Sequence, residues 1–254
     1  MSAPAQKVAI VTGGARGIGR GCALALAEAG FAVALVDLLE PEMARTAAEI
    51  EALGRPALCL DADVADFARA QEVAAAVKER FGRIDFLLNN AGRPMPKGIL
   101  EITEAEYDAT IAVNLKSCFN YIRAVAPVML AQGAGRIASM SSLNAHSGGV
   151  TAALSRFSYA AAKAGIIGMT RALAKELGPR VLVNAICPGL IQTELATKNP
   201  VIVERGAAIA RDGIALHRLG APQDVAQLVV FLAASEPCYI TGQDFKVDGF
   251  QYNM

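Results

Sequence analysis

Apolar and polar positions along the chain follow a repeating order that predicts its secondary structure. Short runs rich in β-branched residues are typical of buried strands, and the Ala- and Leu-rich stretches between them are typical of helices. Strands are predicted at residues 8–11, 32–36, 57–60, 84–88, 135–140, 181–186 and 243–247. Helices are predicted at 20–29, 42–53, 66–80, 117–130 and 224–234, with one opening at Thr103 and another carrying Tyr159 towards Gly178.

A chain that alternates strand and helix in this way predicts an α/β fold with a doubly wound parallel sheet, the Rossmann fold. We expect about seven strands with helices on both faces. Residues 194–219 show no clean strand pattern, and we interpret them as a mobile helical flap over a substrate. No internal repeat or linker interrupts the pattern, so residues 1–254 are predicted to form a single domain.

The composition narrows the classes of protein that fit. Apolar residues make up 54% of the chain, which excludes disorder, and no apolar run is long enough to predict a membrane span. Lys plus Arg equals Asp plus Glu at 24 each, so neither nucleic acid nor an anionic membrane is an expected partner. The five widely spaced cysteines are predicted to be buried thiols in a reducing compartment, which favours a cytoplasmic location.

The first predicted strand runs into a glycine-rich turn, Thr12-Gly13-Gly14-Ala15-Arg16-Gly17-Ile18-Gly19, before the first helix. Glycines let the backbone turn tightly, and the amides at the start of a helix can receive the charge of a pyrophosphate. The spacing is Gly-x-x-x-Gly-x-Gly and not the usual dinucleotide fingerprint. Taken alone, the turn fits a purely structural strand-to-helix connection equally well.

The second strand ends in Asp37, 18 residues beyond Gly19, where a carboxylate can accept hydrogen bonds from the hydroxyls of an adenine ribose. Such an acid repels a 2′-phosphate and favours NAD over NADP, although a solvated acid at a strand end is the plain alternative. Arg16 in the turn points the other way, because a cation there could meet a 2′-phosphate. Asp63 and Val64 follow the third strand and could line an adenine pocket.

Tyr159 and Lys163 are separated by four residues, so on a helix they lie one turn apart on the same face. A free tyrosine is a poor base at neutral pH, and a neighbouring ammonium favours its phenolate form. The spacing arises by chance in many proteins. It gains meaning here because the other polar residues also follow strands of one predicted sheet edge.

These segments together resemble the short-chain dehydrogenase/reductase family. The resemblance covers nearly the whole chain through the glycine turn, Asn89-Asn90-Ala91-Gly92, Asn114, Ser142, Tyr159-x-x-x-Lys163, Pro188-Gly189, Tyr239-Ile-Thr-Gly-Gln243 and Val247-Asp-Gly249. It implies that Tyr159 exchanges a proton with the substrate oxygen and that Lys163 supports the tyrosine and holds the nicotinamide ribose. It further implies that Ser142 orients the substrate oxygen and that Asn114 holds a water in a proton relay; a purely structural Asn114 is the competing interpretation.

The predicted sites follow from the residues and the resemblance together. The catalytic residues are Asn114, Ser142, Tyr159 and Lys163, and the mechanism requires no metal. The cofactor-binding residues are Gly13, Arg16, Gly17, Ile18, Gly19, Asp37, Asp63, Val64, Asn90, Ala91, Gly92, Tyr159, Lys163, Pro188, Gly189, Ile191 and Thr193. The substrate pocket is predicted to contain Ser142, Asn144, His146 and Tyr159.

One departure concerns the serine. Ser142 lies 17 residues before Tyr159, whereas in many relatives the corresponding spacing is four residues shorter. Ser141 and Ser147 are therefore alternatives to Ser142. The longer loop, with Asn144 and His146, is expected to shape a wall of the substrate pocket, and His217 is expected to be structural.

The leading functional hypothesis is an NAD-dependent oxidoreductase that interconverts a secondary alcohol, of polyol or sugar type, and its ketone. An NADPH-dependent 3-oxoacyl thioester (acyl-carrier-protein) reductase is the alternative, and a non-catalytic dinucleotide sensor is a remote one that the intact catalytic residues disfavour. The resemblance also implies a homotetramer formed through the helices at 120–130 and 159–177.

Overall fold

The computed structural model describes residues 6–149, 154–194, 196 and 199–251, and in this part of the chain one parallel sheet carries the fold. Its order is β3-β2-β1-β4-β5-β6-β7, and every neighbouring pair is parallel. The strands are β1 (Val8–Thr12), β2 (Ala32–Asp37), β3 (Ala57–Asp61), β4 (Phe86–Asn89), β5 (Gly135–Met140), β6 (Val181–Pro188) and β7 (Asp244–Val247). The predicted doubly wound sheet of about seven strands is confirmed.

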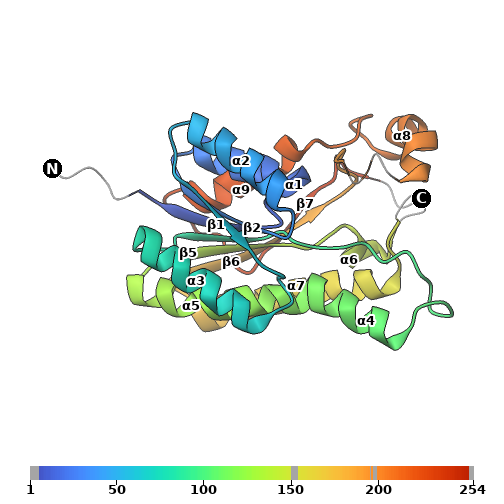
Figure 1. The fold of residues 1–254 in the computed structure, drawn as a ribbon. Helices are drawn as coiled ribbons and strands as arrows, with labels where there is room; N and C mark the ends of the chain where they lie inside the picture. Colours follow the sequence, from blue (N-terminus) through green and yellow to red (C-terminus); the bar gives the residue numbers. More distant parts are fainter. Residues whose placement is uncertain (1–5, 150–153, 195, 197–198, 252–254) are drawn as a thin grey trace.

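Helices cover both faces of this sheet (Figure 1). The layer on one face contains α1 (Gly17–Glu28), α2 (Glu40–Ala52) and α9 (Pro222–Ala234), and the other contains α3 (Phe67–Phe81), α5 (Ser117–Gln132) and α7 (Phe157–Leu177). Each layer packs its own apolar core against the sheet, with Leu26 and Val229 in one and Tyr121 and Ile166 in the other. The strands between them are buried on both sides, which explains their nearly continuous β-branched runs.

The remaining helices lie beyond the carboxyl ends of the strands. They are α4 (Glu104–Ile111), the π-helical turn η1 (Ala112–Lys116), α6 (Asn144–Ser147) and α8 (Pro200–Gly213). The predicted start signals are confirmed, since Asp66 caps α3 and Thr103 forms a capping box with Glu106. Residues 195, 197 and 198 of the predicted flap lie outside the described residues, and α8 forms most of the rest.

Two expectations from the sequence are corrected. The segment that carries Asn114 is a π-helical turn between α4 and α5, and the extension after Ser142 contains a short helix. A further correction concerns the cysteines. All five are free, but the prediction that all are buried is wrong for Cys59, which is exposed on the edge strand β3, and for Cys238, which is half-buried. None of the helices in the described ranges combines the length and apolar character that crossing a bilayer requires.

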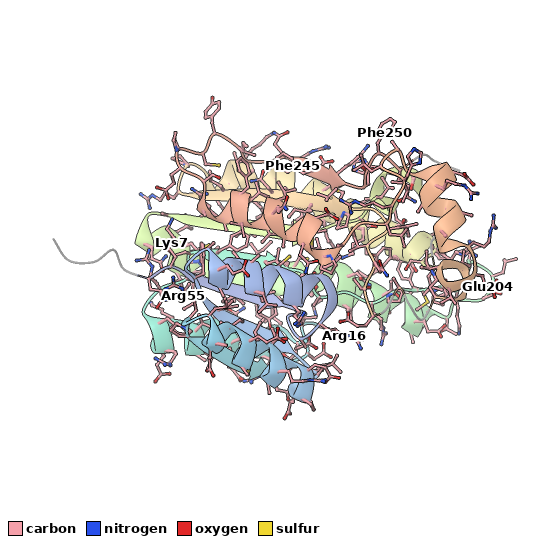
Figure 2. The ribbon with its side chains drawn as sticks, turned by 90° about the horizontal axis from the view of Figure 1, so that it is seen from above. Lys7, Arg16, Arg55, Glu204, Phe245 and Phe250 are labelled. Carbon is pink, nitrogen blue, oxygen red and sulfur yellow. The ribbon has the colours of Figure 1, made fainter. Side chains whose placement is uncertain are left out.

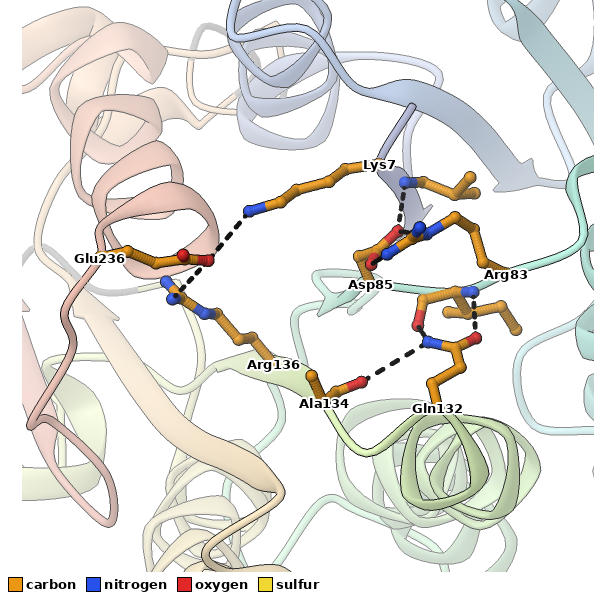
Figure 3. A network of polar contacts seen from close by, with 9 residues as sticks. Lys7, Arg83, Asp85, Gln132, Ala134, Arg136 and Glu236 are labelled. Carbon is orange, nitrogen blue, oxygen red and sulfur yellow. Dashed lines mark hydrogen bonds and ion pairs between the residues drawn. The ribbon is translucent and has the colours of Figure 1, made fainter. Parts of the chain in front are cut away.

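Side-chain contacts fix the amino-terminal edge of the sheet (Figure 3). Asp85 accepts hydrogen bonds from the Val8 amide at 2.8 Å and from Arg83. The amide of Gln132 pairs with both backbone groups of Ile84. Asp85 thus holds β1 to the residues that precede β4, and Gln132 fixes the end of α5 to the same residues, at the end of the sheet opposite the one where polar residues follow the strands.

The start of α9 is fixed by Asp224, which accepts hydrogen bonds from the Ala221 amide at 2.7 Å and from the Arg218 guanidinium at 2.6 and 2.8 Å. Pro222 then packs against Gly21 of α1, where an added Cβ would lie 2.8 Å from the proline Cβ. The Arg218 guanidinium lowers the pKa of Asp224 from its usual 3.8 to about 2. This cap therefore helps to position α1, the helix that follows the glycine turn.

We expect Asp224→Asn to lower the free energy of unfolding by about 1 kcal/mol near neutral pH, the usual value of a helix cap. Because the folded-state pKa is depressed, the carboxylate stabilises the fold above its unfolded pKa and loses this effect as pH falls towards 2. Urea unfolding at several pH values should show the difference between variant and parent shrinking below pH 4. Asp212→Asn, at an exposed pair with Arg211, is the control and should change stability little; an equal loss in both variants would contradict the capping role.

Candidate active site

The strand order reverses direction between β1 and β4, and polar residues collect beyond the carboxyl ends of the strands around this point. A ligand in an open α/β sheet binds at such a switch point. A cavity of about 590 Å³ lies there. Figure 2 shows Arg16 at this end of the molecule, together with Phe250 and Glu204 and away from Lys7 and Arg55.

The structure brings most predicted cofactor residues to this cavity. Its lining includes Gly13, Arg16, Gly17, Ile18, Gly19, Asp37, Asp63, Val64, Asn90, Ala91, Gly92, Tyr159, Lys163, Pro188, Gly189 and Thr193. Ile191 lies apart from them, in the lining of a smaller adjoining cavity of about 210 Å³. Residues far apart in the chain thus form one continuous surface.

The glycine turn has the geometry expected for an anion-binding loop. Gly13 and Gly17 have φ values of 65° and 56°, which favour glycine. A Cβ on Gly19 would overlap the Gly13 carbonyl oxygen and approach Asn90 Nδ2 to 2.6 Å. No side chain hydrogen-bonds the cap of α1 and none of its own first-turn residues is acidic. The nearby carboxylate is that of Glu194, which lies 3.7 Å from the position of a Cβ on Gly17. The positive end of the helix fits the diphosphate of a dinucleotide.

Asp37 lies between the glycine turn and the cavity. One carboxylate oxygen accepts a hydrogen bond from the Ala15 amide at 3.1 Å, and the other accepts from the amides of Leu38 and Leu39 at 2.8 and 3.2 Å. These bonds hold the carboxylate at the cavity wall. Asp63 is exposed and accepts from the Ala65 amide, while the neighbouring Val64 is buried.

Thr12 connects the glycine turn to the segment that follows β4. Its hydroxyl oxygen accepts hydrogen bonds from the amides of Asn90 and Ala91 at 3.0 and 3.1 Å. The Asn90 side chain donates in return to the carbonyls of Thr12 and Gly13, both at 3.0 Å. The two sides of the switch point are therefore one hydrogen-bonded unit.

Tyr159 and Lys163 lie on α7 with both side chains at the larger cavity. The Lys163 ammonium is 5.5 Å from the centroid of the Tyr159 ring, so its charge acts on the phenol across a short distance. Lys163 is buried, and its Nζ donates to the Met140 carbonyl at 2.7 Å. A cation held in this way is positioned for a fixed electrostatic role.

Asn114 is fully buried in η1 but lines neither cavity. Its amide group donates to the carbonyls of Arg93 and Thr110, and its oxygen accepts from the Arg93 amide at 3.1 Å. The side chain therefore holds the segment after Gly92 in place. π-helical turns often occur at functional sites, and this one brings Asn114 beside Lys163, since a Cβ on Gly92 would lie within 3.5 Å of both side chains.

Of the three candidate serines, the structure gives Ser142 the position that suits a substrate contact. Ser142 lines both cavities, and its oxygen accepts from the Asn144 amide at 3.2 Å, which leaves its hydroxyl proton to donate. The Ser141 hydroxyl is buried and donates to the Lys163 carbonyl at 2.7 Å. Ser147 bonds the backbone of its own turn and lies outside both cavities.

The extension after Ser142 divides between two surfaces. Asn144, at the start of α6, lines the smaller cavity with Ser142 and Tyr159, as the substrate-pocket prediction requires. His146 lines neither cavity; its Nε2 lies 3.1 Å from Asp244 of β7. In a single turn of helix, residues two apart point to different sides, so the loop prediction that placed both in the pocket fails for His146. His217 packs outside the cavities, with its ring against the Arg211 carbonyl.

Several cavity residues were not predicted. Arg93 and Glu194 line the larger cavity, Asn199, Ile202 and Gln251 line the smaller one, and Ser155 lines both. Gln251 reaches the cavity from the chain end and accepts from the Leu190 amide at 3.3 Å. None belongs to a recurrent motif. Glu194, Asn199 and Ile202 fall in the segment predicted as a substrate flap, and Arg93 directly follows Asn89-Asn90-Ala91-Gly92, but no signal in the sequence pointed to Ser155 or Gln251.

A sheet of this order with a glycine turn at its switch point is the architecture of dinucleotide-binding α/β proteins. Comparison with known proteins makes the class specific. The family model described as "Enoyl-(Acyl carrier protein) reductase" matches residues 13–249. The chain belongs to the short-chain dehydrogenase/reductase family and is an oxidoreductase.

The relatives described next align with this chain over nearly their full length. A protein from Thermotoga maritima named 3-oxoacyl-(acyl-carrier-protein) reductase FabG is 38% identical over 244 residues, covering 96% of both chains. Oxidoreductase UcpA of Salmonella typhimurium is 37% identical over 96% of this chain and 93% of its own. The crystal structure of a short-chain alcohol dehydrogenase from Sinorhizobium meliloti matches at 36% identity with a TM-score of 0.89, covering 96% of this chain and 95% of that one. Levodione reductase matches at 28% identity with a TM-score of 0.88, covering 96% of each.

The glycine turn generates a test of the candidate cofactor site. We expect Gly19→Ala to weaken NADH binding at least tenfold, because the new methyl group displaces the Gly13 carbonyl and the Asn90 side chain. Fluorescence titration with NADH measures the change. Gly168→Ala in α7, where an added Cβ meets nothing within 4 Å, is the matched control and should bind as the parent does; equal affinities in all three proteins would argue against the site.

Proposed function

We propose that this oxidoreductase interconverts a secondary alcohol and its ketone with NAD(H), using Tyr159 as the acid and base. The observation that carries the proposal is the common surface formed by Tyr159, Lys163 and Ser142 beside the glycine turn. A bound nicotinamide supplies hydride in reduction and accepts it in oxidation. In reduction, Tyr159 donates its hydroxyl proton to the ketone oxygen, and in oxidation its phenolate takes the alcohol proton.

The other residues orient and support this transfer. Ser142 donates its hydroxyl proton in a hydrogen bond to the substrate oxygen and so directs that oxygen towards Tyr159. The Lys163 ammonium stabilises the phenolate left after proton donation. Asn114 holds the Arg93 segment and the turn beside Lys163, and the proposed water relay to solvent starts from this buried region.

For the substrate, the relatives favour the alternative over the leading sequence hypothesis, and we propose a 3-oxoacyl thioester. The name 3-oxoacyl-(acyl-carrier-protein) reductase recurs among relatives at 38–39% identity. The smaller cavity agrees with this substrate. It combines apolar walls of Leu143, Ile191 and Ile202 with amide side chains, as a substrate with an acyl chain and two carbonyl groups requires.

The amide side chains favour a substrate that accepts hydrogen bonds. The oxygens of Asn199 and Gln251 each accept one hydrogen bond, from the amides of Val201 and Leu190, which uses one of two lone pairs, so the two N–H donors of each NH₂ group are the larger capacity for a ligand. The carbonyl groups of a 3-oxoacyl thioester need such donors. A polyol, the second candidate, is favoured by the number of polar residues at this wall, but its hydroxyls also need acceptors.

Other expectations complete the proposal. A homotetramer through α5 and α7 and a cytoplasmic location remain predictions from the family resemblance and the free thiols. A small-molecule alcohol or ketone is the proposed partner, and no nucleic acid is expected.

The proposed acid role predicts the effect of removing one oxygen atom. The parent should reduce a 3-oxoacyl thioester with NADH, and Tyr159→Phe should lose at least a hundredfold in kcat, the lower range of general acid catalysis, while binding NADH nearly unchanged. Steady-state kinetics measures kcat of both proteins on a panel of 3-oxoacyl thioesters, hydroxysteroids, sugars and polyols, with NAD(H) and with NADP(H).

Tyr107→Phe is the control, since Tyr107 stacks on Phe157 away from the cavities and should retain activity. Substantial turnover by Tyr159→Phe would refute the acid role. Turnover of polyols alone by the parent would instead favour the second candidate substrate.

Asp37 predicts the choice of cofactor. Its carboxylate accepts hydrogen bonds from ribose hydroxyls and repels a 2′-phosphate, so NADH should bind at least tenfold more tightly than NADPH. Fluorescence titration should also show that Asp37→Asn narrows this difference. Asp61→Asn changes the acid opposite Asp37 on β3, outside both cavities, and should leave the preference intact. Tighter binding of NADPH by the parent would show that Arg16 dominates.

A further inference from the structure

His146, Cys187 and Asp244 form a cluster on the side of β6 and β7 that faces α6. Their nitrogen, sulfur and oxygen atoms all lie within 4.8 Å of one another. None of the three lines either cavity, although Cys187 hydrogen-bonds Ser141 and the backbone of Ser142, so the cluster adjoins the candidate active site without forming part of its lining. We propose that these side chains bind a zinc ion, or a similar transition-metal cation, that joins α6 to the sheet.

The donor set selects the class of metal. Imidazole nitrogen, thiolate sulfur and carboxylate oxygen are the protein ligands of zinc, whereas calcium and magnesium prefer oxygen. A tetrahedral zinc ion with bonds of about 2.0–2.3 Å holds its ligand atoms about 3.3–3.7 Å apart. His146 Nε2 and Asp244 Oδ2 are already 3.1 Å apart. Cys187 therefore needs a contraction of at most about 1.5 Å, which side-chain rotation can supply.

Asp244 is oriented for this role by a second partner. Its Oδ1 accepts a hydrogen bond from Arg171 at 2.9 Å, while Oδ2 faces His146. Carboxylates that bind metals are commonly fixed by such a bond to their other oxygen. The positive charge of Arg171 opposes a cation, but its side chain is 63% exposed and therefore well screened.

Cys187 provides the buried side of the cluster. It is the penultimate residue of β6, and burial raises the pKa of its thiol, so the metal must displace a proton that the thiol otherwise keeps. A zinc ion favours the thiolate strongly enough to do this. His146 is partly exposed, which leaves the fourth position open to water.

Binding of zinc chloride to the chelator-treated protein tests the proposal. Calorimetry should show one ion per chain, with at least tenfold weaker binding in His146→Gln and Asp244→Asn. Cobalt chloride should produce the near-ultraviolet charge-transfer band of a cobalt–thiolate bond in the parent and not in Cys187→Ser. The chain supplies matched controls, because His217→Gln and Cys59→Ser alter the other histidine and an exposed cysteine.

The control variants should bind both metals as the parent does. Parent-like zinc binding in His146→Gln, or loss of the cobalt band in Cys59→Ser, would place the ion elsewhere and overturn the proposal, as would the absence of binding to the parent. Thermal unfolding without metal shows whether Cys187→Ser folds. If it does not, His146→Gln still decides, because this partly exposed side chain can be replaced without altering the core.

Discussion

The hydroxyl of Thr12 joins the two halves of the candidate active site. The hydroxyl oxygen accepts hydrogen bonds from the amides of Asn90 and Ala91. The Asn90 side chain donates two hydrogen bonds in return, to the carbonyls of Thr12 and Gly13. At the switch point, the segments that follow β1 and β4 lead to helices on opposite faces of the sheet, and these hydrogen bonds hold the two segments together. The larger cavity lies between the two segments that this connection joins. Because the bonds form between backbone and short side chains, they hold the turn before any ligand arrives.

Much of the fold could be predicted because its signals are local. β-branched runs and helix caps such as Asp66 and Thr103 act within a few residues, and the structure confirms them. The residues at the switch point could also be predicted, since the carboxyl ends of parallel strands necessarily meet at one edge of the sheet. The π-helical turn at Asn114 was not, because it depends on contacts with Arg93, 21 residues away.

The residues of the smaller cavity were harder to predict for a related reason. Asn199 and Gln251 meet at one cavity only after the whole chain has folded, and neither has a spacing that reveals the other. The direction of His146 depended on whether its segment formed a loop or a single helical turn. Family membership follows from motifs spread over the chain, whereas substrate choice depends on isolated side chains.

The two bonds that Lys163 makes to the end of β5 have a consequence for how the enzyme can change. Its ammonium binds the Met140 carbonyl and its own carbonyl accepts from Ser141, so the residues next to Ser142 are fastened directly to α7. The chain between Ser142 and Tyr159 therefore does not set the distance between these two residues. A change in the length of this segment would therefore leave the end of β5 bonded to α7, and with it the position of Ser142 relative to Tyr159.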